Sequence, residues 1–497
     1  MHYIIQIIGR FDYEEVNWVV KDEEYEDNEK YRSPLISYSI FNHYKKSNPS
    51  EDYEVMLLIP ESLVTYVAKD ASEAFDLLKN KDKLKEKFLN KIKESYSSAL
   101  SNLKFDVSII QSIGSYKSSA SNRYIVRFEN YVDNIVSYLL FDLINLKNVN
   151  GITFDVSTGL NINVCSMIEA LKTLIVYHKL LKILQGGKGI HVKLAFAPPV
   201  AKELKDLSYS IELYTYDAKA FFDLPIKKSF RIDELTDLQE KKYKELSQSR
   251  EKINKAISML KLMFNIVKLN TPLALFKCLK TCDGTEIVEL NDLLSLEELL
   301  SELTMILNHI KGETKVELID DSIKVKYYKV NRNLLANVIL SISLYSSLRE
   351  FAFRVKEIKP SINQIKRLFS GDEGSEGIYK MVNLEVNKRF LERDLEDIKT
   401  KTKNLNIEEW ALLKGLEKQK PLPLKLKFLR KFKAIKKKVE EGKNEKFRSN
   451  EKRNFFAHSG FLEKYTYVKK EGDEILLSYD CSKETIREIK SWINDPS

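Results

Sequence analysis

A chain of 497 residues is too long for one hydrophobic core, so we expect it to divide into two or three domains. Apolar residues make up 43% and charged residues 31%, which excludes a disordered chain and is typical of a soluble globular protein. The four cysteines are too few and too scattered for a disulfide scaffold, and no signal peptide opens the sequence. The longest uncharged run, Asn333 to Leu348, contains several Ser and Asn residues, so we expect a cytoplasmic protein without a membrane span.

Strand and helix signals alternate along the first two hundred residues. Apolar runs predict strands at residues 3–8 and 55–59, and further strands in segments that begin at Phe105, Gly151 and His191. Helices are expected between them: after Ser33 and Pro34, in a lysine-rich stretch before Phe105, over residues 123–146, and from Val164 to Leu181. Near-continuous apolar strands separated by helices indicate a Rossmann-like α/β domain with a mostly parallel sheet covered on both faces.

The pattern changes to predominantly helical after a strand-like segment that ends near residue 217. Two hairpin-like interruptions, at residues 315–330 and 465–479, break the helical part. We therefore expect an α/β domain over 1–216, a helical linker region with a β-hairpin insertion over 217–360, and a mainly α-helical domain over 361–497.

Small and polar residues gather where the predicted strands of the α/β domain end. They are Gly9, Arg10, Ser62, Gly114, Ser115, Tyr116, Ser157, Thr158, Gly159 and Asn161. Ligands of open α/β sheets bind outside the carboxyl ends of the strands. The turn from Asp155 to Asn161 leads directly into a helix, whose N–H groups and dipole suit a phosphate. Any one of these loops has an alternative explanation as ordinary turn chemistry, but four of them on one edge favour a binding site.

Positive charge is concentrated near the end of the chain. Residues 421–453 hold thirteen Lys and Arg against four Glu, a net of 13 − 4 = +9, which equals the net charge of the whole chain. Such a segment suits a polyanionic partner, because its cations displace counterions from phosphates. A solvated face of a lysine-rich helix is the alternative interpretation.

The basic segment runs into the sequence RNFFAHSGF, which begins at Arg453. On a helix, Asn454 and His458 are four apart and share a face, and Arg453, placed near a helix start, could reach a common point with them. Histidine moves protons near neutral pH, and arginine holds a phosphate that gains charge, so the set suits attack of a ribose 2′-hydroxyl on the adjacent phosphate without a metal. One Arg and one His make a sparse site, and a two-fold dimer would supply a second copy. A core helix anchored by Phe455 and Phe456 is the alternative.

The two halves together resemble a known family. RNFFAH resembles the Arg-x-x-x-x-His signature of HEPN ribonucleases, and DVSTGLN resembles the Asp-x-Thr-His-Gly-x-Asn turn of CARF domains, the ligand sensors of type III CRISPR systems. Ser157 stands in the Thr place and Thr158 in the His place. The order CARF then HEPN is that of the CRISPR-associated ancillary ribonucleases.

The resemblance implies a homodimer, or a higher oligomer of dimers, whose paired CARF domains bind cyclic oligoadenylate, with cyclic tetra-adenylate the favoured ring size. Binding would activate cleavage of single-stranded RNA at paired HEPN sites, with Arg453, Asn454 and His458 catalytic and no metal or other cofactor. The ten residues at the strand ends would form the activator site. Because Thr158 replaces a histidine, the resemblance leaves open whether the sensor degrades its own activator.

Two rival hypotheses belong to other classes. A non-catalytic, ligand-gated regulator that binds nucleic acid through its basic helical half would use the same Asp155–Asn161 turn and the same basic segment. A nucleotide-cofactor enzyme on a doubly wound sheet is disfavoured, because no GxGxxG turn follows the first strand.

Overall fold

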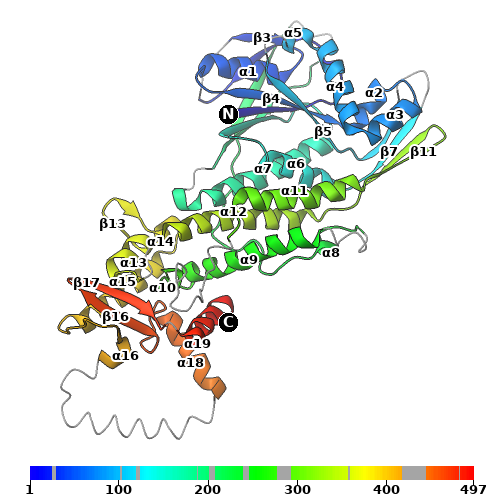
Figure 1. Cartoon of the computed structure of the whole chain (residues 1–497). Helices are drawn as coiled ribbons and strands as arrows, with labels where there is room; N and C mark the ends of the chain where they lie inside the picture. Colours follow the sequence, from blue (N-terminus) through cyan, green and yellow to red (C-terminus); the bar gives the residue numbers. More distant parts are fainter. Residues whose placement is uncertain are drawn as a thin grey trace, which may run out of the picture.

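The chain forms an α/β lobe that contains the N-terminus, a lower lobe that contains the C-terminus, and long helices between them (Figure 1). The computed structural model describes residues 1–24, 29–100, 103–118, 124–186, 189–200, 207–238, 246–276, 293–355, 359–416, 444–480 and 482–496, without the side chains of 98, 99 and 444–449.

The α/β lobe is built on a sheet in which the described residues supply eight strands, in the order β3-β2-β10-β9-β8-β1-β4-β5. Five strand pairs are parallel, and the β9–β10 and β2–β3 pairs are antiparallel. The strands are β1 His2–Ile7, β2 Val16–Lys21, β3 Lys30–Ser33, β4 Tyr53–Pro60, β5 Phe105–Ile110, β8 Gly151–Asp155, β9 His191–Phe196 and β10 Ser208–Thr215. The expected mostly parallel α/β fold is therefore confirmed, whereas the edge hairpin β2–β3 was not predicted, because its strands are short and only half apolar.

Helices cover both faces of this sheet. They are α1 Ile36–Ser47, α2 Val64–Val67, α3 Ala71–Lys79, α4 Lys81–Ser95, α5 Ser97–Leu100, α6 Val132–Ile144 and α7 Asn161–Leu181. The helix expected after Ser33 and Pro34 is present, but a capping role that Ser33 would suit at its start is not found. The helix begins at Ile36 after Leu35, and the Ser33 hydroxyl instead bonds to the backbone of Leu35 at the end of β3.

The first part of the helix expected over 123–146 is instead a strand of a second sheet. The order of this sheet is β11-β12-β7-β6, formed by β11 Lys315–Ile319, β12 Ser322–Lys326, β7 Ile125–Glu129 and β6 Gly114–Lys117. The start of the expected helix is thus strand β7, in which buried Val126 and Phe128 alternate with exposed Ile125 and Arg127. The predicted hairpin β11–β12 is present, and its pairing partner β7 lies almost two hundred residues earlier, which local periodicity does not show.

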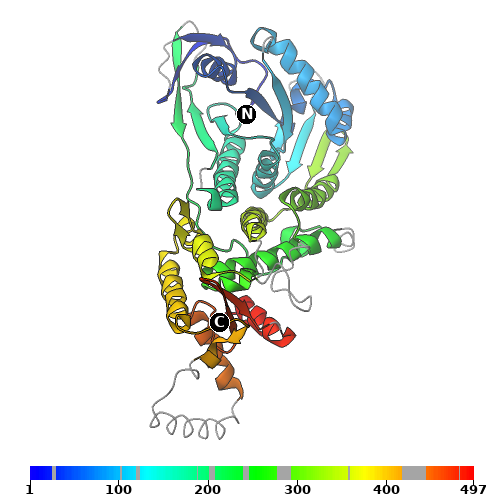
Figure 2. The ribbon, with the colours of Figure 1, turned by 60° about the vertical axis from the view of Figure 1, so that its left-hand side comes forward.

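Helices, both long and short, connect the two lobes. They are α8 Ile232–Leu235, α9 Ser247–Lys268, α10 Leu273–Phe276, α11 Leu296–Gly312 and α12 Arg332–Arg354. Helix α12 contacts α6 and α7 on one side and α9 on the other, so it lies between the eight-stranded sheet and the lower lobe (Figure 2). One hydrophobic core runs continuously from β1 through these helices to the last helix, and a separate core fills the other face of the sheet.

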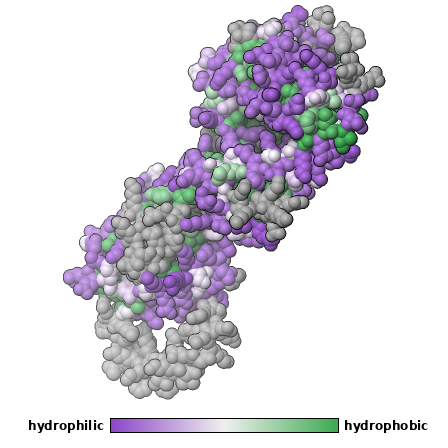
Figure 3. All heavy atoms as spheres, turned by 45° about the vertical axis from the view of Figure 1, so that its right-hand side comes forward, coloured by the Kyte–Doolittle hydropathy of each residue, from purple (hydrophilic) through white to green (hydrophobic). Residues whose placement is uncertain are grey.

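The lower lobe is mainly helical and contains the second predicted hairpin. Its elements are α13 Ile362–Phe369, β13 Gly371–Asp372, β14 Ser375–Glu376, α14 Ile378–Met381, α15 Glu385–Thr402, β15 Ala411–Leu412, α16 Leu413–Leu416, α18 Asn444–Ala457, β16 Thr466–Glu471, β17 Glu474–Tyr479 and α19 Lys483–Asn494. The face shown in Figure 3 is mostly hydrophilic over both lobes, with its larger apolar patches on the α/β lobe. Among the helices of the described ranges, none combines the length and apolar content that crossing a bilayer requires.

Candidate functional sites

A cavity of about 400 Å³ lies outside the carboxyl ends of β1 and β8, the neighbouring central strands of the sheet. Five of the ten residues predicted at the strand ends line it: Gly9, Arg10, Ser157, Thr158 and Gly159. The structure thus brings the loop after the first strand and the DVSTGLN turn together, as the general rule for α/β sheets predicts.

Two glycines allow these loops to touch. Gly159 has φ of +93°, and a Cβ atom there would lie 2.5 Å from Cγ2 of Ile7. A Cβ on Gly9 would lie 3.0 Å from the Cα of Gly159. The backbones therefore approach each other more closely than side chains would permit, and this close approach shapes the floor of the cavity.

The side chain of Asp155 stabilises the turn that follows it. Its carboxylate is fully buried and accepts hydrogen bonds from the backbone N–H of Ser157, at 2.9 Å, and from the Thr158 hydroxyl. Burial raises the pKa of Asp155 to about 6, although these hydrogen bonds favour the charged form. The Thr158 hydroxyl also lies 3.0 Å from the carbonyl oxygen of Ile7. The single hydroxyl hydrogen of Thr158 can therefore go to only one of these two oxygens at a time, that of Asp155 or that of Ile7.

Arg10 is positioned by aromatic neighbours. The Tyr13 hydroxyl accepts a hydrogen bond from the backbone N–H of Gly9 at 3.0 Å, and the guanidinium of Arg10 lies 5.1 Å from the centre of the Tyr13 ring. Tyr96 stacks on Tyr13 and donates to the carbonyl oxygen of Arg10 at 3.2 Å. The Arg10 side chain remains about half exposed at the cavity, where it can meet a negatively charged ligand.

The other five predicted residues do not line this cavity. Ser62 is buried, with its N–H bound to the Ser112 hydroxyl, and Gly114, Ser115 and Tyr116 belong to strand β6 of the second sheet. Asn161 is exposed at the first position of α7. The cavity instead extends the other way, towards residues that the sequence analysis did not include, namely Tyr13, Glu14, Pro34, Ile36, Leu160, Pro198, Pro199 and Val200. The Pro-Pro pair after β9 was the available signal, since it ends a strand at the same edge.

The RNFFAH segment lies on α18, but not as expected. Arg453 is in the second half of the helix rather than near its start, and His458 directly follows its last residue. The backbone N–H of His458 still bonds to the carbonyl oxygen of Asn454 at 3.2 Å, which keeps these two residues in helical register. Ser459 and Gly460 then take left-handed conformations, with φ of +50° and +78°, and end the helix.

Asn454 and His458 line one cavity of about 310 Å³, together with Asp394, Asp397 and Lys401 from α15. Both of the predicted residues are exposed, as is Arg453, which lies outside the lining of this cavity. The interpretation of the two phenylalanines as anchors is confirmed for Phe455, which is buried with its ring centre 5.4 Å from those of Phe456 and Trp492.

The turn that carries His458 is held by a chain of buried hydrogen bonds. The Ser459 hydroxyl donates to Asp394 at 2.6 Å and accepts from the side-chain amide of Asn270 at 2.8 Å. Asn270 in turn accepts from the Tyr379 hydroxyl at 2.7 Å. Three other segments, those of Asp394, Asn270 and Tyr379, therefore fix the residue next to His458, and such a buried network resists displacement.

Lys401 is the cation nearest to His458 in the lining of this cavity, and its charge is engaged. Its ammonium group lies 2.8 Å from Asp397 and 2.9 Å from Glu463. Burial alone would lower the pKa of Lys401, but hydrogen bonds to the two carboxylates raise it, so the side chain stays charged. The basic segment 421–453 cannot be placed against this cavity, since residues 417–443 lie outside the described ranges.

The sites fall within two family matches. A family model described as CRISPR system endoribonuclease Csx1, CARF domain, matches residues 3–199, and one described as CRISPR system endoribonuclease Csx1, HEPN domain, matches residues 384–484. A comparison with curated proteins gave no match. The first range contains the loops around Gly9 and Gly159, and the second contains α15 and the RNFFAH helix. The chain therefore belongs to the CRISPR-associated ancillary ribonucleases that join a CARF domain to a HEPN domain.

Proposed function

We propose that this protein is an endoribonuclease that cyclic oligoadenylate activates, with cyclic tetra-adenylate as the favoured ring size. The observation that carries the proposal is the shared cavity of Asn454 and His458 inside the HEPN match. Cleavage of single-stranded RNA there proceeds without a metal. The 2′-hydroxyl attacks the adjacent phosphate, the bond from phosphorus to the 5′ oxygen breaks, and His458 moves a proton from the attacking hydroxyl to the departing oxygen, so one fragment ends in a 2′,3′-cyclic phosphate and the other in a 5′-hydroxyl.

In this proposal, Arg453 acts at the interface between two copies of the chain. It is exposed but does not line the cavity of its own Asn454 and His458. A two-fold partner brings a second α18 against the first, so that guanidinium groups from both copies face the reacting phosphate. The proposed division of labour assigns the sensor to 1–216, the connecting helices and hairpin to 217–360, and the nuclease to 361–497.

The activator binds in the cavity between β1 and β8, where Arg10 and the first turn of α7 meet its phosphates. Helix α7 starts at this cavity and packs on α12, with the Ser343 hydroxyl donating to the carbonyl oxygen of Tyr177 at 2.5 Å. Helix α12 packs on α9, and shortly after the end of α9 comes Asn270, which bonds to Ser459. This contiguous packing supports a rigid connection between activator and nuclease, and coupling measurements decide whether it transmits the signal.

The direct test is incubation of end-labelled single-stranded RNA with the full chain in EDTA, with and without cyclic tetra-adenylate. We expect activator-dependent fragments with cyclic phosphate ends, and none from His458→Ala. Phe456→Leu on the same helix serves as the matched control. Undiminished cleavage by His458→Ala, or a requirement for magnesium, would contradict the proposal. Activator-dependent binding of duplex DNA without any RNA fragments would instead support a non-catalytic regulator.

A further inference from the structure

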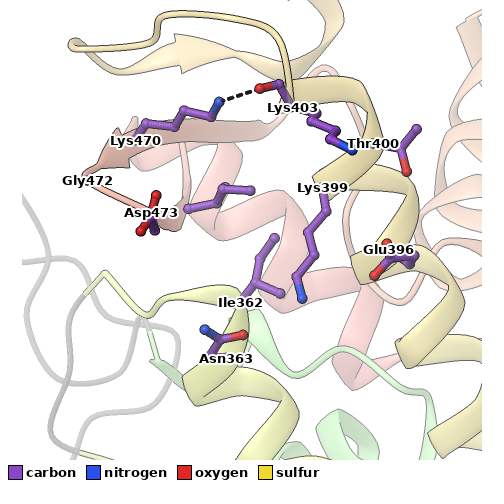
Figure 4. A pocket seen from close by; sticks show the side chains of 10 residues that line it. Ile362, Asn363, Glu396, Lys399, Thr400, Lys403, Lys470, Gly472 and Asp473 are labelled. Atoms are coloured by element: carbon purple, nitrogen blue, oxygen red, sulfur yellow. Dashed lines mark hydrogen bonds between the residues drawn. The ribbon is translucent and has the colours of Figure 1, made fainter.

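A second and larger cavity of the lower lobe, of about 570 Å³, is lined in part by residues of α15 (Figure 4). Its walls are the start of α13, one face of α15 and the turn between β16 and β17. In Figure 4, Lys399 extends from α15 across this space towards Ile362 and Asn363. The volume is sufficient for a nucleotide-sized group rather than for a single small ion.

Helix α15 separates this cavity from the one that contains His458. The cavity that contains His458 is lined by Asp394, Asp397, Ile398 and Lys401 of α15. The second cavity is lined by Glu396, Lys399 and Thr400 of α15 and by Lys403, which caps the helix. Each set repeats at three- and four-residue spacing, and the second is displaced from the first by two residues. At about 100° per residue the two sets lie about 200° apart, on opposite faces of one helix.

The lysines of the two cavities differ in whether they form ion pairs. Lys401, beside His458, is held between two carboxylates. Lys399 and Lys403, four residues apart and therefore neighbours on the helix surface, make no ion pair with any residue in the described part of the chain. The third lysine, Lys470, donates to the carbonyl oxygens of Lys403 and Leu405 at 3.1 and 3.0 Å, so it secures the end of α15. Two cations are thus available to a ligand.

The lining also discriminates between anionic ligands. Glu396, Asp473 and the amide of Asn363 line the same cavity as the two lysines. Carboxylates repel phosphates and acidic side chains alike, so they favour an anionic ligand that also carries hydrogen-bond donors. A single RNA strand carries phosphates for the lysines, and it carries 2′-hydroxyl and base amino donors for Glu396, Asp473 and Asn363.

We propose that this cavity, centred on Lys399 and Lys403, binds the phosphates of single-stranded RNA a few nucleotides away from the bond that is cut. The proposal rests on the proposed ribonuclease function and adds a substrate-binding site to it. RNA that leaves the His458 cavity passes around α15, whose diameter with side chains is about 10 Å, and reaches the two lysines. Their contribution is to affinity and not to the chemical step.

The test uses the full chain carrying His458→Ala, so that RNA is bound but not cut, with cyclic tetra-adenylate present. Fluorescence anisotropy gives the affinity for labelled single-stranded RNA between 50 and 200 mM salt, with and without Lys399→Gln and Lys403→Gln. Each phosphate contact on a single strand contributes about 0.7 to the slope of log affinity against log salt, so two lost contacts lower it by about 1.4. Over this fourfold range the parent protein should lose about sevenfold more affinity than the double variant.

Lys483→Gln with Arg487→Gln is the matched control. Both residues are exposed, and they are four apart on α19. For this control variant, we expect the slope of log affinity against log salt to equal that of the parent. In the cleaving background, Lys399→Gln with Lys403→Gln should raise KM and leave kcat unchanged. Glutamine has nearly the helix propensity of lysine, so the variant keeps its fold.

The outcomes separate this inference from the function on which it rests. If the wild-type chain cuts RNA but the Lys399 and Lys403 variant keeps the parental slope and KM, this site does not bind substrate and the nuclease proposal is untouched. If an acidic peptide competes with RNA for the same lysines at equal affinity, the assignment to RNA is wrong. If the wild-type chain does not cut RNA at all, both proposals fall together.

Discussion

The side-chain amide of Asn270 donates a hydrogen bond to the Ser459 hydroxyl over 2.8 Å, although the two residues are 189 positions apart. Asn270 is buried in a left-handed conformation, with φ of +56°, at the end of α9, and Ser459 follows His458. A residue of the connecting helices therefore sets the position of the turn that holds the proposed catalytic histidine.

Asn270→Gly should remove this contact while it preserves the left-handed backbone. It leaves Tyr379 and Ser459 short of a buried partner, so we expect a loss of about 1–3 kcal/mol in the free energy of unfolding. Cleavage should slow roughly ten- to a hundredfold because His458 is misplaced, with RNA affinity unchanged. Denaturant unfolding and single-turnover cleavage measure the two effects. Asn387→Ala is the control, since Asn387 caps the same helix end through Val267 and Lys268 without touching Ser459.

Asp155→Asn should change how stability depends on pH. Burial raises the pKa of Asp155 from 3.8 to about 6. Between about pH 4 and pH 6 the folded carboxyl group therefore binds a proton that the unfolded chain has lost, so stability falls as the pH rises through this window and stays lower above it. This rise in the pKa of Asp155 corresponds to about 3 kcal/mol in the free energy of unfolding.

The asparagine variant cannot ionise, and its side-chain oxygen can still accept the hydrogen bond from the N–H of Ser157. We expect Asp155→Asn to be more stable than the wild type at pH 7.5 and equal to it near pH 4. Thermal unfolding across this range checks the difference. A parallel pH dependence in both proteins would show that Asp155 ionises as an ordinary surface carboxyl group does.

Gly159→Ala should damage the activator cavity. Its Cβ would lie 2.5 Å from Ile7, in a conformation with positive φ. Gly186→Ala is a close control, because Gly186 has φ of +85° with open space around its Cβ position. We expect Gly159→Ala to lose roughly 1–3 kcal/mol more stability than Gly186→Ala and to bind cyclic tetra-adenylate more weakly. Calorimetric titration with the activator, alongside thermal unfolding, separates the two consequences. Equal behaviour of the two variants would mean that the close approach of the loops is unimportant.

Tyr327→Phe should loosen the hairpin β11–β12 from the sensor. The Tyr327 hydroxyl donates to the carboxylate of Glu61, which is buried at the end of β4 and also pairs with Lys81 at 2.8 Å. Burial and the adjacent carboxylate raise the pKa of Tyr327 well above its ordinary range, so the hydroxyl keeps its proton and donates.

Loss of that donor leaves Glu61 partly unsatisfied, and we expect about 1–3 kcal/mol of destabilisation. Tyr328→Phe is the control, because in the described part of the chain no hydrogen bond to its hydroxyl is found and the residue is only half-buried. Denaturant unfolding of both variants measures the difference, and a Tyr327→Phe variant as stable as Tyr328→Phe would refute the prediction.

The sequence predicted the local parts of the fold well, for physical reasons. The strand β1 and the turn from Asp155 to Gly159 are recognisable because an unbroken apolar run and a small-residue turn are local properties. The pairing of β7 with β12 is not local, and Ile125 and Phe128 also match helical spacing. The periodicity therefore favoured a helix where long-range pairing produces a strand.

The same distinction applies to the sites. Asn454 and His458 share a cavity because residues four apart on a helix share a face. Their neighbours Asp394 and Asn270 come from distant segments that only packing brings together. Ser62 was expected at the activator site from its place after a strand, but the second sheet and its hairpin cover that end of the edge.

Strand β12 also affects how the protein can be divided. It lies beside β7 and supplies hydrogen bonds along its whole length, although the two belong to regions that the sequence separates near residue 217. A fragment that stops there would leave β7 with an open edge that carries Val126 and Phe128, now fully buried. Open apolar edges recruit strands from other molecules. An isolated sensor fragment should therefore aggregate unless residues 315–330 are joined to it.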